Sequence, residues 1–99
     1  MIHHLPFTFL LISFRMYKAR ITITLKPSIL DPKGKASLGA LHNLGYENIK
    51  NVRIGKSVEL DIDADSEADA RSAAELAAQK LLANEVMEDF DIELLEETA

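Results

Sequence analysis

Three aspartates at every second position, Asp61, Asp63 and Asp65, have the spacing most suggestive of metal chemistry in this sequence. Alternate residues of a strand share one face, so these carboxylates would line up on the same side. A calcium loop also needs a glycine turn and a distal bidentate glutamate, and this segment has neither. We therefore predict a solvated or partner-facing acidic edge here and no metal site.

The histidines and nucleophiles indicate no catalytic centre. His42 has no serine or cysteine at a triad spacing, and the pair His3 and His4 has no third metal ligand nearby. The chain has no cysteine, which excludes disulfides, thiolate zinc sites, iron-sulfur clusters and a cysteine nucleophile. The usual phosphate-loop, dinucleotide, zinc-protease and hydrolase-elbow motifs are also missing. We expect no catalytic residue, no metal and no cofactor on this chain.

The charge divides the chain into two unlike segments. Its 99 residues suit one domain, and a net charge of -5 gives no general attraction to nucleic acid or to membranes. Residues 17–56 carry eight basic and two acidic side chains, whereas residues 57–99 carry two basic and fourteen acidic ones. Because opposite charges attract, we predict that the two segments interleave in one sheet.

The hydrophobic pattern from residue 18 onward alternates between strand and helix periods. It predicts strands over residues 18–26, 51–54, 58–63 and 90–94, and helices over residues 36–44 and 66–84. Gly45 is expected to end the first helix, Asp65 or Ser66 to cap the second, and Asn84 to close it in a left-handed conformation. The second helix is expected to pack on the sheet through Ala70, Ala73, Ala74, Ala77 and Leu81.

This element order, β-α-β-β-α-β, predicts an α+β fold of the ferredoxin-like type, with two helices on one face of a four-stranded antiparallel sheet. Strand 18–26 would lie between strands 90–94 and 58–63, with strand 51–54 at the outer edge. A turn at residues 55–57 would then pair Ile54 with Val58, Val52 with Leu60 and Arg53 with Glu59. The open face would carry alternating acidic and basic strands, and it could be buried in a homodimer or tetramer.

The first fifteen residues differ from the rest. Their hydrophobic stretch is shorter than the roughly 20 apolar residues of a membrane span, and they lack the basic start and small-residue cleavage site of a signal peptide. We predict that residues 1–15 are a non-native or disordered extension, that Met16 is the natural start, and that residues 16–99 form a single domain. The alternative is a segment that packs on a partner.

Two sequence words carry a family resemblance: L-K-P-x-I-L-D-P-x-G from Leu25 to Gly34, and L-G-Y-x-N-I-K-N-V-R-I-G-K from Leu44 to Lys56. With the KLLAN run near the end of the second helix, they closely resemble the PurS family over Met16 to Glu93. PurS is the small subunit of phosphoribosylformylglycinamidine synthase in purine biosynthesis. The chain departs from the usual pattern at Glu85, where proline often follows the LLAN word.

The resemblance implies an accessory, non-catalytic subunit of a glutamine-dependent carbon-nitrogen ligase in the cytoplasm. The partners would be the synthetase subunit PurL, which uses ATP and Mg²⁺, and the glutaminase subunit PurQ; this chain would bridge them and support ammonia transfer. The expected partner contacts lie in the two family words: Lys26, Pro27, Asp31, Pro32, Gly34, Arg53, Gly55 and Lys56. Asp31 alternatively caps a turn, and the two glycines alternatively satisfy backbone geometry.

Two other functions are compatible with the same topology. A small-molecule regulatory domain would bind an effector at a dimer edge. An RNA-binding domain would need aromatic side chains on the middle strands, and these strands offer threonines and acidic residues instead. Neither alternative accounts for the two family words.

Overall fold

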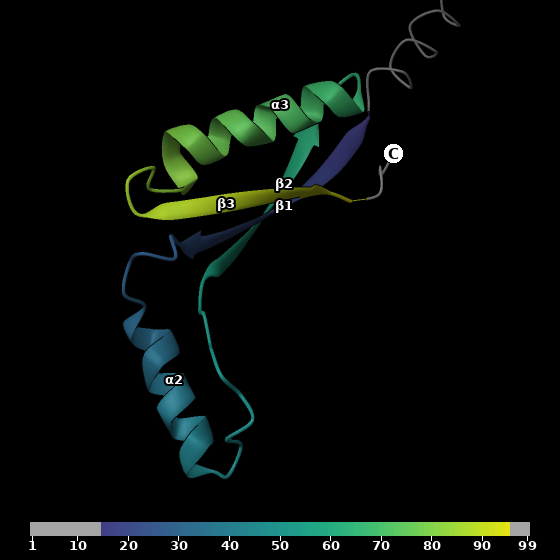
Figure 1. The fold of residues 1–99 in the computed structure, drawn as a ribbon. Coiled ribbons are helices and arrows are strands. Elements are labelled where there is room, and N and C mark those ends of the chain that lie inside the picture. Colours follow the sequence, from purple (N-terminus) through teal and green to yellow (C-terminus); the bar gives the residue numbers. More distant parts are fainter. Residues whose placement is uncertain (1–14, 96–99) are drawn as a thin grey trace, which may run out of the picture.

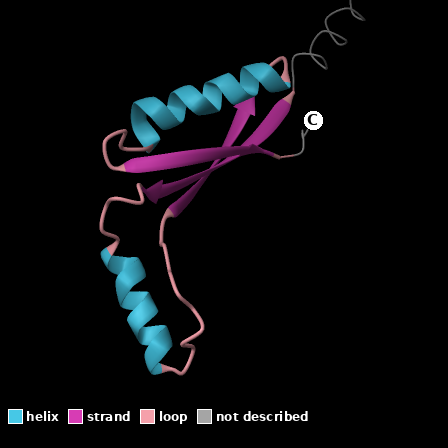
Figure 2. Ribbon diagram, viewed as in Figure 1, coloured by secondary structure: helices cyan, strands magenta, loops and turns pink. Residues whose placement is uncertain are grey.

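The computed structural model describes residues 15–95, which form an α+β fold with one antiparallel sheet (Figures 1 and 2). In chain order the elements are β1 (Met16–Leu25), α2 (Pro32–Asn43), β2 (Lys56–Asp63), α3 (Glu67–Ala77), the π-helical turn η1 (Ala78–Leu82) and β3 (Glu88–Leu94).

β1 is the central strand of the sheet, whose order is β2-β1-β3. Ile21 lies opposite Val58 on β2 and Ile92 on β3, so apolar residues meet on one face across all three strands. The prediction that the first strand lies between the strands at 58–63 and 90–94 is confirmed.

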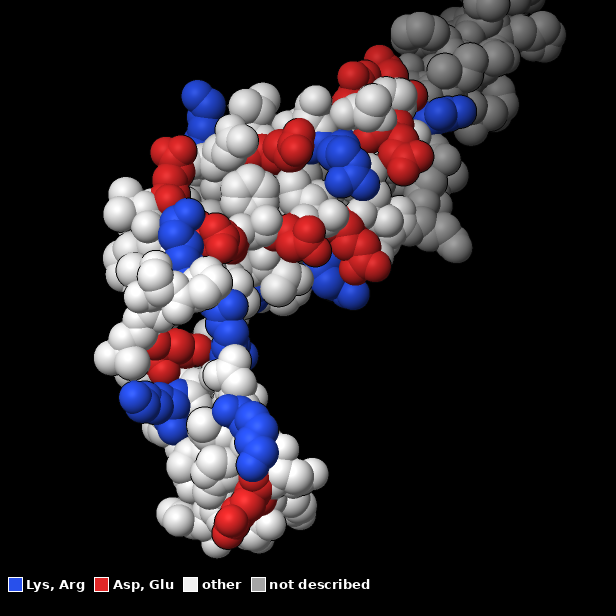
Figure 3. Space-filling view, viewed as in Figure 1, with Lys and Arg blue, Asp and Glu red and all other residues white. Residues whose placement is uncertain are grey.

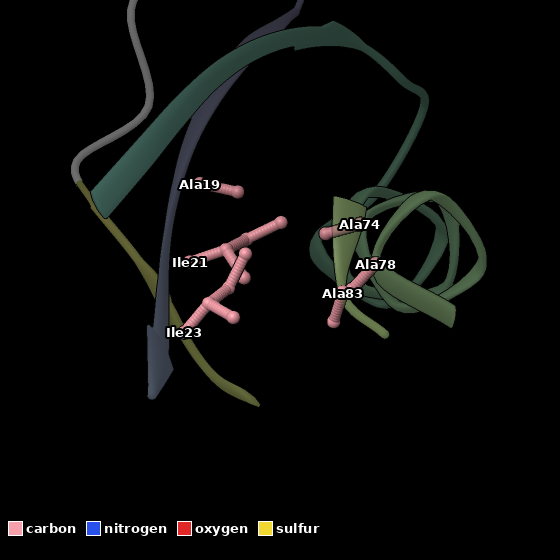
Figure 4. Close-up of a cluster of buried hydrophobic side chains, with 6 residues drawn as sticks. All are labelled: Ala19, Ile21, Ile23, Ala74, Ala78 and Ala83. Carbon is pink, nitrogen blue, oxygen red and sulfur yellow. The ribbon is translucent and has the colours of Figure 1, made fainter. Parts of the chain in front are cut away.

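The core lies between β1 and α3. Ile21 and Ile23 are fully buried and point toward Ala74 and Ala78, as the close-up in Figure 4 shows. Alanine on the buried face lets the helix approach the sheet closely, which explains why the alanine-rich helix packs there. Ser66 caps α3, since its hydroxyl oxygen accepts a hydrogen bond from the Asp69 N–H at 3.1 Å.

The buried face of α3 differs in detail from the predicted stripe. Ala70 and Ala74 are buried, but Ala73 and Leu81 are exposed. The buried alanines recur every fourth residue, and the helix then widens into the π-helical turn η1, which moves Leu81 off the sheet. Asn84 is not a left-handed cap; its side-chain oxygen instead accepts hydrogen bonds from the N–H groups of Val86 and Met87.

Complementary charges join the strands on the face of the sheet away from α3. Arg20 lies between two acids, with N–O distances of 3.2 Å to Glu59 and 3.7 Å to Glu93. Lys18 lies 3.1 Å from Asp61. Figure 3 shows acidic and basic groups interspersed over the body of the molecule. The prediction that the oppositely charged segments interleave in one sheet is confirmed.

The predicted strand at residues 51–54 is wrong for the described residues, and so is the hairpin register of Val52, Arg53 and Ile54. Residues 51–54 are extended, but they lie beside α2 on the way to β2 and pair with no strand of the described sheet. Lys56 lies in β2 opposite Ile23, and not in a hairpin tip. Gly55 lies against β1, and its φ is not positive, so the chain continues into β2 without the tight turn.

The helix α2 stands away from the sheet, whereas α3 lies along it (Figure 1). The prediction placed both helices on one face. In α2 only Gly34 is buried, whereas Leu38 and Leu41 are half-buried and Ala36 and Ala40 are exposed. The prediction for residues 1–15 falls almost wholly outside the described residues.

Candidate docking surface

We use the term arm for residues 27–55, which comprise the loop after β1, the helix α2, the turn at Gly45 and the extended segment that returns to β2. Figure 1 shows the arm projecting from one end of the sheet. The arm is held by its own hydrogen bonds. The N–H of Tyr46 donates to the carbonyl of Leu41 at 3.0 Å, and Nε2 of His42 lies 2.7 Å from the carbonyl oxygen of Ile49.

Gly45 ends α2 as predicted, with φ of +100°. This left-handed conformation costs glycine little, and it reverses the chain at the outer end of the arm. The arm therefore consists of a helix and an antiparallel extended segment closed by a glycine turn.

One carboxylate joins the two halves of the arm at its base. Oδ1 of Asp31 accepts from the N–H of Gly34 at 3.0 Å, which caps α2. Oδ2 of Asp31 accepts from the N–H of Ile54 at 2.8 Å, at the end of the extended segment. These two hydrogen bonds to the ionised form lower the pKa of Asp31, and the positive charge of Arg53 acts in the same direction against the effect of burial.

Two glycines at the base of the arm allow backbone segments to approach each other closely. A Cβ at Gly34 would lie 2.3 Å from the carbonyl oxygen of Val52. A Cβ at Gly55 would lie 2.2 Å from the carbonyl oxygen of Ile23 and 2.8 Å from Cγ2 of Thr24. Gly34 therefore lets α2 meet the extended segment, and Gly55 lets the extended segment meet the central strand.

Seven of the eight predicted contact residues line two grooves at the base of the arm. One groove, of about 560 Å³, lies between α2, the loop after β1 and the extended segment; it includes Pro27, Asp31, Gly34 and Arg53. The other, of about 390 Å³, lies where the arm meets the sheet; it includes Asp31, Pro32, Gly55 and Lys56. Asp31 belongs to both grooves. Their contact with partner subunits stays a prediction.

The three predicted cations differ in their availability to a partner. Lys26 lies apart from the two grooves, and its Nζ is 3.2 Å from the carboxylate of Asp89 on β3. Arg53 and Lys56 are exposed at the base of the arm. Of the three, Arg53 and Lys56 are the cations best placed to meet an acidic partner surface.

The sequence analysis did not identify the apolar surface of the arm. Leu44 is 73% exposed and Tyr46 is 54% exposed at the outer end, while Leu30 is 66% exposed near the base. The sequence pattern places Leu44 at the end of a helix and Leu30 in a loop, and it marks neither as part of a surface. The sequence does carry one sign of this surface. The segment of α2 lacks an apolar face wide enough to pack on a sheet, so the apolar residues next to that helix are expected to stay exposed.

Asp61, Asp63 and Asp65 do not form a metal site. No group of three or more potential metal ligands occurs within residues 15–95, and Asp61 pairs with Lys18 on the open face. No helix in this described part of the chain is long and apolar enough to cross a membrane. What the arrangement offers is a projecting arm, two open grooves and an apolar tip.

Comparison with known proteins identifies the family. The sequence model described as PurS, phosphoribosylformylglycinamidine (FGAM) synthase, matches residues 18–96. The PurS subunit of Synechocystis sp. is 44% identical over 78 residues, which are 79% of this chain and 78% of the relative. The crystal structure of Bacillus subtilis PurS is 42% identical with a TM-score of 0.70, covering 81% of this chain and 99% of that one.

A second structural neighbour is an assembly. It is the structure of PurLQS from Thermotoga maritima, in which the matched chain is 26% identical with a TM-score of 0.76, covering 81% of this chain and 98% of that chain. The family model spans both sequence words, including every residue that lines the base of the arm. The chain therefore belongs to the PurS family of phosphoribosylformylglycinamidine synthase subunits.

Proposed function

We propose that this chain is a non-catalytic assembly subunit of phosphoribosylformylglycinamidine synthase in the cytoplasm, where it bridges the synthetase and glutaminase subunits. The observation that carries the proposal is the arm. It projects from the sheet with exposed Leu44 and Tyr46 at its end, and such exposed apolar groups are typical of a binding surface. The Thermotoga maritima neighbour, whose name joins PurL, PurQ and PurS, supports the same role.

The proposed division of chemistry follows from the residue types. This chain has no cysteine, so glutamine hydrolysis by a cysteine nucleophile belongs to the glutaminase subunit. ATP and Mg²⁺ belong to the synthetase subunit. Ammonia released from glutamine is largely protonated in water at neutral pH, so an assembly that keeps the two catalytic chains together protects the nucleophile during transfer.

We also propose that a second copy of the chain covers part of the sheet. Val58, Leu60 and Ile62 face the same side as α3 but are only half-buried, because one helix lies on a face for which two were expected. The arm of a second copy offers the missing apolar cover. Sedimentation of the free chain tests this: a dimer or tetramer is expected, and a monomer at micromolar concentration would contradict it.

Reconstitution tests the bridging role. The synthetase and glutaminase subunits are mixed with and without this chain, and amidine formation is measured with glutamine or with ammonium salt as the nitrogen donor. We expect the chain to raise the glutamine-dependent rate and to leave the ammonium-dependent rate nearly unchanged. Equal glutamine-dependent rates with and without the chain would overturn the proposal, as would turnover by the chain alone.

A further inference from the structure

We infer that Asp31 is a positioning residue that fixes the direction of the arm relative to the sheet. Both of its carboxylate oxygens already accept backbone hydrogen bonds from its own chain, from Gly34 and from Ile54. The bond to Ile54 joins residues that are 23 positions apart. The consequence for assembly rests on the proposed function, but the structural role does not.

The hydrogen bond to Ile54 lies where the arm joins the sheet, so it can control the direction of the whole arm. Ile54 directly precedes Gly55, which lies against the backbone of Ile23 in the central strand β1. The loop after β1 and the returning segment are the two connections between the arm and the sheet (Figure 1). The bond from Ile54 to Asp31 joins one connection to the other. A small change at this junction would therefore produce a large displacement at Tyr46, at the outer end.

The chemistry of the site selects aspartate over the other capping residues. Serine and asparagine also cap helices, but each offers one side-chain oxygen, whereas a carboxylate offers two. A serine at position 31 is long enough to cap α2 through Gly34 and too short to serve Ile54 as well. Asp31→Ser therefore separates the capping bond from the bond that closes the base of the arm.

Amide hydrogen exchange in the full chain provides the direct test. In Asp31→Ser we expect the Ile54 amide to exchange at least about tenfold faster, while the Gly34 amide keeps most of its protection. In Asp31→Ala both amides should exchange faster. Ile21, which lies at the centre of the sheet, reports whether the fold survives. Asp31→Asn, with one oxygen in an isosteric group, is the second variant, and it should weaken one of the two bonds.

The direction of the arm is measured separately. The chain has no cysteine, so Tyr46→Cys at the outer end of the arm and Glu75→Cys on α3 give two unique sites for spin labels. We expect a narrow distance distribution with Asp31 and a clearly broader one with Asp31→Ser. An unchanged Ile54 exchange rate or an unchanged distribution in Asp31→Ser overturns the inference.

Reconstitution then separates this inference from the proposed function. If Asp31→Ser broadens the distance distribution and lowers the glutamine-dependent rate, both are supported. If it broadens the distribution but the wild-type chain has no effect on that rate, Asp31 still positions the arm and the bridging function is lost.

Discussion

At the scale of single residues, Gly55 is the glycine at which an added Cβ would lie nearest to another atom. A Cβ there would lie 2.2 Å from the carbonyl oxygen of Ile23, and that backbone belongs to the central strand. Because the strand is held by neighbours on both sides, it cannot move aside easily. We predict that Gly55→Ala lowers the free energy of unfolding by about 1–3 kcal/mol, measured by urea denaturation.

Gly39 provides the matched control for this substitution. It lies in the middle of α2, and a Cβ there would meet nothing within 4 Å. Gly39→Ala should stabilise α2 by about 0.5–1 kcal/mol, because alanine loses less conformational freedom in a helix. Equal effects of the two substitutions would show that the close approach at Gly55 carries no energetic weight.

Acid should release the bond between Asp31 and Ile54. The hydrogen bonds from Gly34 and then Ile54 lower the pKa of Asp31 below its ordinary value of 3.8. A carboxylate whose pKa is lower in the folded state stabilises the fold above the unfolded value, and this contribution is lost as the pH falls through the folded value. We predict that the amide shifts of Gly34 and Ile54 titrate together, below pH 3.8.

The control for the titration is Asp31→Asn, in which no carboxyl remains to protonate. The two amide shifts should then stay flat over the same acid range. A shared titration at or above the ordinary aspartate value in the wild-type chain would contradict the prediction, because it would mean that the ionised form gains nothing from the two N–H groups.

Local residue chemistry was largely predictable from sequence. The cap at Ser66 and the stop at Gly45 depend on neighbours within a few positions, and both are confirmed. For Asp31 the sequence offers a cap only as the alternative to a partner contact, and it gives no sign of the second hydrogen-bond partner, Ile54. Nothing in the local pattern indicates a hydrogen bond between residues so far apart in the chain.

At the scale of elements, α3 packs on the sheet through alanines spaced four residues apart. Ala74 is fully buried against β1, while its neighbour Ala73 is exposed. We predict that Ala74→Leu destabilises the protein by about 1–3 kcal/mol, because added methyl groups must push the helix away from Ile21 and Ile23. Ala73→Leu is the control and should change stability by less than about 0.5 kcal/mol. Thermal unfolding of both variants measures the difference, and similar losses would contradict the assigned face.

Residues 51–54 show where element prediction failed, because the structure has no strand there. The alternating pattern of these residues is real. Val52 is half-buried, but it lies beside α2 within the arm and not in the sheet. Period-two alternation tells which residues share a face, and it does not tell which element lies opposite. β1, by contrast, was predictable as a strand because its alternating apolar residues, Ala19, Ile21 and Ile23, are the ones that the core buries.

At the scale of the whole molecule, the structure gathers charge differently on the body and on the arm. On the sheet, acids and bases neutralise each other across strands, as between Arg20 and Glu59. At the base of the arm, Arg53 and Lys56 are exposed beside the two grooves. The seven predicted contact residues that line the grooves come from the two family words, and their contact with partners stays a prediction. The separation of the arm from the sheet, by contrast, required the structure.

This distribution predicts that Arg53 and Lys56 steer the docking of a partner subunit. Reversing both charges, with Arg53→Glu and Lys56→Glu, should weaken association with the synthetase and glutaminase subunits at least about fivefold at low salt, and less at high salt. Titration of the labelled chain with the partner subunits measures the affinity.

The control is the double variant Arg71→Glu with Lys80→Glu, which changes the net charge equally at exposed positions of α3 and η1. Because Arg53 also lies near Asp31, the Ile54 exchange rate is followed in parallel. Weaker association with unchanged exchange would assign the loss to docking, whereas equal losses in both double variants would show that only net charge matters.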